Sequence, residues 1–149
     1  GNLRYIAMHE LAHSYLYYKN ARENLKDLFA PIYELAATVL GLRLAGTLLL
    51  EDVITSKQLE SMIIAYVCRS IYLIEKDKAN IYLAYPVMGS TIFINFMHDS
   101  GALKQTKGEV IPNFMKIFVS LQELSYILER LLSFGTRKDA EVLVEKYVK

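Results

Sequence analysis

Two histidines four residues apart, His9 and His13, place the strongest constraint on how this chain can fold. On an α-helix, side chains at positions i and i+4 lie on one face, with Cβ atoms about 5–6 Å apart. A helix therefore lets both imidazoles bind a single metal ion. The chain has 3 histidines in all, so this one motif takes most of them. The spacing predicts a helix near the start of the chain that carries a metal site.

Glu10 follows the first histidine and completes the pattern His-Glu-Leu-Ala-His. Its side chain lies one position round the helix from His9, close enough to reach a metal-bound water without being a ligand itself. In the HExxH signature, zinc polarises a water molecule and the glutamate accepts its proton. The motif thus indicates Zn²⁺ as the cofactor, with His9 and His13 as metal ligands and Glu10 as a catalytic residue.

A hydrolytic zinc site usually has three protein ligands and leaves a fourth position for water. Our candidate for the third ligand is Glu34, 21 residues after the second histidine. The chain can reverse over residues 20–29, and a helix beginning at Pro31 can then return Glu34 to the histidines. Acids favour the first turn of any helix, so a solvated Glu34 is the alternative. In that case Glu23 or Asp27 would be the fallback ligand.

The two segments together resemble the gluzincin metallopeptidases, the thermolysin-like branch of the zincins, over about the first 40 residues. In gluzincins the HExxH helix is followed about twenty residues later by a helix with the third ligand, often as ExxA or ExxxD. Residues 34–37 of this chain read Glu-Leu-Ala-Ala. The resemblance implies zinc-dependent hydrolysis of peptide bonds, zinc ligation by His9, His13 and Glu34, and Glu10 as general base and acid.

A downstream histidine, often paired with an acid, donates a hydrogen bond to the tetrahedral oxyanion in this family. The resemblance implies this catalytic role for His98, which is followed by an aspartate. A histidine in an ordinary loop is the alternative, because loops commonly hold such residues. The chain also has 11 tyrosines that offer hydroxyl donors, but no spacing singles one of them out.

Two features depart from the gluzincin pattern. Gluzincins usually place a β-sheet before the HExxH helix, whereas eight residues precede His9, so we expect this chain to lack that sheet. Position 38 is Thr38, not the aspartate that often orients the first histidine, so we expect another residue to orient His9. These departures leave two alternatives to a peptidase: a metal-binding or inactive helical interaction module, and a metal-free helical protein.

The hydrophobic periodicity predicts a mainly α-helical single domain of five to seven helices over residues 1–149. An alternative is that this domain forms the C-terminal part of a longer chain. Gly41 is expected to end one helix, and residues 98–109 are expected to form a loop with turns at Gly101 and Gly108. The expected helices span residues 3–19, 31–40, 42–50, 57–76, part of 79–97, 113–134 and 137–148.

Composition narrows the expected partners and location. A net charge of +1 argues neither for a nucleic-acid binder nor for a strongly acidic partner. The resemblance implies a peptide or protein substrate as the partner. Residues 35–50 and 79–97 are apolar, but glycine, proline and polar residues interrupt them, so buried helices are favoured over membrane association. The lone cysteine, Cys68, is expected to be buried. One cysteine and no signal peptide favour a cytoplasmic location.

Overall fold

The computed structural model describes residues 1–148, which form seven α-helices, two short 3₁₀-helices and one β-hairpin. The predicted single helical domain of five to seven helices is confirmed. The elements, in chain order, are α1 (Asn2–His13), α2 (Ala21–Leu25), the 3₁₀-helix Lys26–Leu28, α3 (Phe29–Leu50), α4 (Ser56–Asp77), the 3₁₀-helix Lys78–Asn80, α5 (Tyr85–Asp99), β1 (Leu103–Thr106), β2 (Glu109–Pro112), α6 (Phe114–Phe134) and α7 (Arg137–Tyr147).

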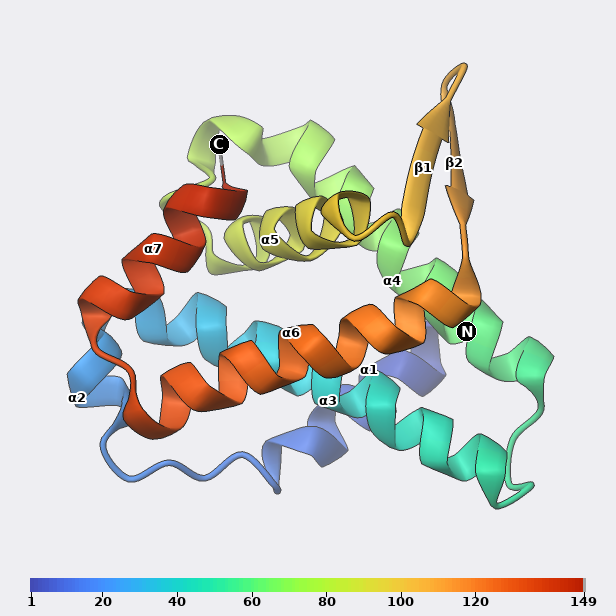
Figure 1. The fold of residues 1–149 in the computed structure, drawn as a ribbon, viewed down its shortest axis with the longest axis horizontal. Helices are drawn as coiled ribbons and strands as arrows, with labels where there is room; N and C mark the ends of the chain where they lie inside the picture. The colour runs from blue at the N-terminus through green and yellow to red at the C-terminus, as the bar shows by residue number, and fades with distance from the viewer. Residues whose placement is uncertain (149) are drawn as a thin grey trace.

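Helix α3 is the central element, and it packs against α1, α5, α6 and α4 (Figure 1). Its 22 residues are mostly apolar and are buried on several sides, as expected for a helix with neighbours all around it. The helical run Ala21–Leu50 is long and apolar enough to span a membrane by length and composition. Of the residues in its most apolar 18-residue window, 61% are buried inside the fold.

The expectation that Gly41 ends a helix is wrong, because α3 continues through it to Leu50. A Cβ atom at Gly41 would lie 2.8 Å from the backbone carbonyl of Met8 and 2.9 Å from the backbone nitrogen of His9. Ala37, one turn before Gly41, is fully buried and small as well. The glycine is therefore required for close approach of the two backbones, and this approach places the HExxH helix on α3.

Gly41→Ala is expected to destabilise the fold by about 1–3 kcal/mol, because the added methyl group meets the α1 backbone, which cannot rotate away. Gly46→Ala is the matched control on the same helix, since its Cβ would meet only the Phe118 ring at 3.7 Å. The control is expected to be neutral or to stabilise by up to about 1 kcal/mol through helix propensity. Urea unfolding of both variants measures the difference, and equal stabilities would contradict the close-approach argument.

The first helix ends at His13, six residues before the predicted end at Lys19. The Ser14 hydroxyl donates a hydrogen bond to the Leu11 carbonyl at 2.6 Å, which satisfies a carbonyl that the helix end leaves free. Leu16 is then buried in the core, so the chain turns inward there instead of continuing along the helix axis. The HExxH motif consequently lies in the last two turns of α1.

Residues 98–109 were expected to form a loop, and this prediction is wrong in part. Strands β1 and β2 pair antiparallel, with Thr106 opposite Glu109, and the hairpin projects from the helices (Figure 1). Lys107 and Gly108 form its two-residue turn, and both have positive φ, 50° and 81°. The turn was recognisable from the sequence. The strands were not, because each has four residues and few buried side chains, so the alternation of apolar and polar residues is too short to identify a strand.

The other predicted helices are confirmed with small shifts of their ends. Helix α4 begins at Ser56, one residue before its predicted start, and Thr55 caps it with a capping box. The uncertain segment 79–97 forms α5, with Pro86 in its first turn. Asn113 caps α6, and Thr136 caps α7 through a second capping box.

Candidate metal centre

The structure brings three of the predicted site residues together at the crossing of α1 and α3. The side chains of His9, His13 and Glu34 each present one possible ligand atom, and these atoms lie within 4.8 Å of one another. All three side chains are partly buried, with 18%, 23% and 35% of their surface exposed, respectively. The group could hold a metal ion and has an open side toward solvent.

The separations of the three atoms fit a tetrahedral metal site. His9 Nε2 lies 3.0 Å from His13 Nε2 and 3.1 Å from Glu34 Oε2, and His13 Nε2 lies 3.5 Å from the same oxygen. Ligands at about 2.0–2.2 Å from a tetrahedral zinc ion are themselves roughly 3.3–3.6 Å apart, so the longest separation matches and the two shorter ones need to open slightly when the ion binds. The donor set, two imidazoles and one carboxylate, is also the set that zinc accepts. The residues present therefore fit a zinc ion.

Thr38 orients the first histidine, so the expectation that another residue would do so is wrong. The Thr38 hydroxyl lies one turn beyond Glu34 on α3, and its oxygen is 2.7 Å from His9 Nδ1. With its proton on Nδ1, His9 donates to this hydroxyl and leaves Nε2 free to face the cluster. A hydroxyl oxygen thus performs here what the aspartate does in the family pattern, with a shorter side chain at the close helix crossing.

The environment of His9 favours the neutral imidazole. Burial lowers the pKa of His9, and the neighbouring His13 lowers it further, while Glu34 acts in the opposite direction. A metal-binding imidazole must be unprotonated on the nitrogen that it offers, so a low pKa favours metal binding. The His13 imidazole packs against the Tyr33 ring, and their centroids lie 5.0 Å apart.

Thr38→Val is expected to weaken zinc binding about 10–100-fold, because His9 loses the partner that fixes its ring orientation and its tautomer. The side chain keeps its volume, so the helix packing is expected to survive. Thr47→Val, at an exposed position on the same helix, is the matched control. Competition with a chromogenic zinc chelator measures both affinities, and an unchanged affinity for Thr38→Val would show that this hydrogen bond does not support the site.

Glu10 is exposed and lines a hollow of about 710 Å³ together with His9 and Thr38. Its carboxylate is absent from the cluster of three possible ligands, in agreement with a role beside the metal rather than on it. A smaller hollow of about 140 Å³ is lined by His9, Glu34 and the first turns of α5, including Tyr85 and Ser90. His9 thus borders both hollows, and Glu34 borders the smaller one.

His98 is not brought to the cluster. It lies in the last turn of α5, with Nδ1 3.1 Å from the Leu103 carbonyl oxygen at the start of β1. Ser90, which lines the smaller hollow beside His9, precedes it by eight residues, or roughly 12 Å along a helix axis. This placement gives no support to the oxyanion role that the resemblance implies for His98.

The remaining candidates of the sequence analysis lie elsewhere. Asp27, a fallback ligand, forms an ion pair with Arg137 at 2.7 Å, and this hydrogen bond lowers the pKa of the carboxyl. Glu23 is exposed on α2. Cys68, which was expected to be buried, is exposed on α4 and lines the larger hollow beside the cluster. Its apolar neighbours in the sequence suggested burial, but the buried ones, Ile63, Tyr66 and Val67, lie on another face of the helix, whereas Ile64 on the same face is exposed too.

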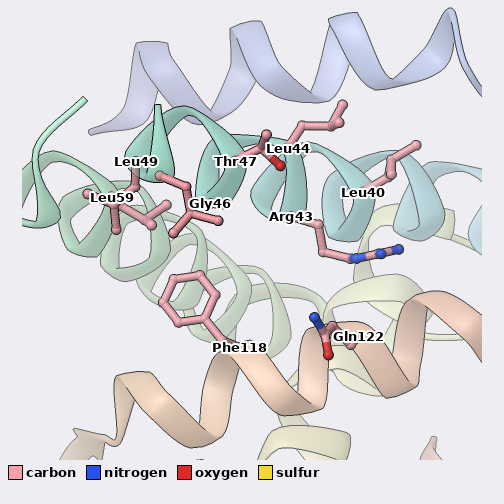
Figure 2. A pocket seen from close by; sticks show the side chains of 10 residues that line it. Leu40, Arg43, Leu44, Gly46, Thr47, Leu49, Leu59, Phe118 and Gln122 are labelled. Carbon is pink, nitrogen blue, oxygen red and sulfur yellow. The ribbon is translucent and has the colours of Figure 1, made fainter. Parts of the chain in front are cut away.

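A separate apolar groove lies between α3, α4 and α6, with a volume of about 370 Å³ (Figure 2). Leucines of α3 and Phe118 form most of its wall. Arg43 borders the groove, but its guanidinium donates a hydrogen bond to Ser125 and lies 3.6 Å from Glu129. The charge of Arg43 is therefore already balanced, and the groove offers no reactive group.

Comparison with known proteins identifies the fold. Neither a protein-family model nor a curated protein sequence matches the chain. Two solved structures are similar over 98% of it: dipeptidyl-peptidase III from Caldithrix abyssi, at 21% sequence identity, and from Corallococcus sp. strain EGB, at 24%. Both have a TM-score of 0.79. The chain has the fold of part of these proteins.

That part is small. The chain spans 29% of the length of the Caldithrix protein and 28% of the Corallococcus protein. The match covers almost the whole of this chain, from the HExxH helix to α7, so the helical fold occurs within these larger peptidases as one portion. At 21% and 24% identity the similarity is one of fold.

Proposed function

We propose that this chain carries the zinc centre of a metallopeptidase and hydrolyses peptide bonds. One observation carries the proposal: the ligand atoms of His9, His13 and Glu34 lie 3.0–3.5 Å apart, close enough to bind one tetrahedral metal ion. These residues span 25 positions of the sequence, from His9 to Glu34. The likeness in fold to dipeptidyl-peptidase III supports a peptidase. Assignment to the thermolysin-like branch rests on the sequence resemblance alone.

In this proposal the chain's own residues have distinct tasks. His9, His13 and Glu34 hold the ion, and Thr38 keeps the His9 ring in the required orientation. Zinc, when bound, lowers the pKa of water toward neutrality and polarises the substrate carbonyl. Glu10 accepts the proton of the attacking water and then donates it to the leaving amine. Its exposed position beside the larger hollow leaves it free for both transfers.

The two hollows that His9 borders suit an extended substrate. Peptide on one side of the scissile bond would occupy the larger hollow next to Glu10, and peptide on the other side would lie toward Tyr85 and Ser90. Peptides are therefore the proposed substrates, and the dipeptidyl-peptidase activity named for the two similar structures is one form that the cleavage takes in this proposal.

Removal of zinc is expected to abolish hydrolysis, and one equivalent of Zn²⁺ is expected to restore it. A short-peptide library, analysed by mass spectrometry before and after chelation, measures this directly. Far-ultraviolet circular dichroism of the zinc-free protein is the control, because the helices are packed through α3 and should remain folded. Protein that binds one zinc and cleaves no peptide would favour the inactive metal-binding module, and protein that binds no zinc would favour the metal-free alternative.

A further inference from the structure

An arginine that forms no ion pair within residues 1–148 lies beside the candidate metal centre. Arg69, on α4, is exposed and lines both hollows next to the cluster, as do His9 and Thr38. It also lies close to Tyr66: burial raises the pKa of Tyr66 to about 12, and the positive charge of Arg69 opposes that rise. The guanidinium therefore belongs to the wall of the site.

Arg69 is one of four arginines without an ion pair within residues 1–148, and the other three, Arg4, Arg22 and Arg130, line neither hollow beside the cluster. Arg43 is paired with Glu129, and Arg137 with Asp27 and Glu141. No ion pair within this part of the chain involves Arg69, although the carboxylate of Glu10 lines the same hollow. The guanidinium has five N–H donors in a rigid fork, and Arg69 lines both hollows together with His9 and Thr38.

The chemistry of the guanidinium selects its ligand. Arginine binds carboxylates through two parallel, charge-assisted hydrogen bonds, which are stronger and more directional than neutral ones. A peptide extended across the cluster passes Arg69 on the way from one hollow to the other. Its backbone amides are neutral, so the group that matches Arg69 is a carboxylate, either the C-terminal one or that of an acidic side chain.

We propose that Arg69 binds a carboxylate of the peptide substrate and makes the site selective for peptides that carry one near the scissile bond. This inference rests on the proposed peptidase function. Arg69 is then a binding residue that orients the peptide across the cluster, while Glu10 and the metal ligands perform the chemistry. Its loss is expected to affect binding of carboxylate-bearing peptides and to spare zinc binding.

The test uses zinc-loaded Glu10→Gln protein, in which bound peptide persists, and three probes measured by calorimetry. The probes are tetra-alanine with a free C-terminus, tetra-alanine amide, and Ala-Ala-Asp-Ala amide. We expect Arg69→Gln to weaken binding of at least one carboxylate-bearing probe about tenfold and to leave the neutral amide unchanged. The probe whose binding Arg69→Gln weakens shows whether Arg69 binds a C-terminal carboxylate or an acidic side chain. Arg69→Lys is expected to restore binding in part.

Lys57→Gln is the matched control, because it removes the same charge from an exposed position at the start of the same helix. Equal weakening by Lys57→Gln, equal weakening for all three probes, or no binding of any carboxylate-bearing probe would overturn the inference. Zinc content and hydrolysis by the protein with Glu10 intact are measured in parallel. A parent protein that binds no zinc or hydrolyses no peptide would count against the peptidase function. A parent protein that does both, with peptide binding unchanged by Arg69→Gln, would count against the inference alone.

Discussion

Glu10→Gln is expected to lower the rate of peptide hydrolysis about 10²- to 10⁴-fold while the protein keeps its zinc. The amide matches the carboxylate in size, but it cannot accept the proton of the attacking water or return it to the leaving amine. Glu10 lies outside the group of possible metal ligands and is exposed, so neither metal affinity nor folding should change. Rates come from a peptide cleavage assay, and zinc content from elemental analysis of the same samples.

Glu23→Gln is the control for this prediction, since it makes the same change at an exposed position on α2, away from the hollows beside the cluster. It should retain the parent rate. If Glu10→Gln cleaved peptides at the parent rate, Glu10 would not be the general base. If it also lost its zinc, the carboxylate would be part of the metal site.

The second large effect is expected at Glu34. Zinc contributes about 10–16 kcal/mol of binding free energy in structural sites, and removal of one ligand of three should cost roughly a third of that. Glu34→Ala is therefore expected to weaken zinc binding about 10²- to 10⁴-fold. The zinc affinity of Glu34→Gln should lie between those of the parent protein and Glu34→Ala, because the amide oxygen is a weaker, neutral ligand.

Glu75→Ala, an exposed glutamate of α4, controls for the loss of one negative charge. Competition against a chelator of known affinity measures all variants in one format. A Glu34→Ala protein with the parent affinity would mean that the carboxylate merely hydrogen-bonds to His9 at 3.1 Å, and the site would be reduced to two histidines.

The candidate site was more predictable than the path of the chain around it. The i, i+4 geometry of the histidines is a property of any helix, so the pairing of His9 and His13 followed from the sequence. Glu34 required only that the chain reverse and a second helix return. Thr38 was missed because a hydroxyl has many possible partners, and its contact with His9 depends on how closely two helices approach.

The close approach of the two helices was not predicted, because a glycine in a helical sequence can either end a helix or let another backbone pack closely against it. Gly41 was expected to end a helix, whereas it lies where α3 meets the backbone of α1. Neighbouring residues cannot distinguish these uses; only the position of the other helix does. His98 shows the same limit, since its chemistry suited the site but α5 places it near the hairpin. Arg69 carried no motif and became informative only through its place in both hollows.

The most direct test of the zinc centre is a crystal of protein grown with Zn²⁺, with diffraction data collected on both sides of the zinc absorption edge. The account predicts one anomalous peak between α1 and α3, with His9 Nε2, His13 Nε2 and a Glu34 carboxylate oxygen at about 2.0–2.2 Å and a fourth position open to water. A peak bound by other residues, or zinc-saturated crystals with no peak at this crossing, would contradict it.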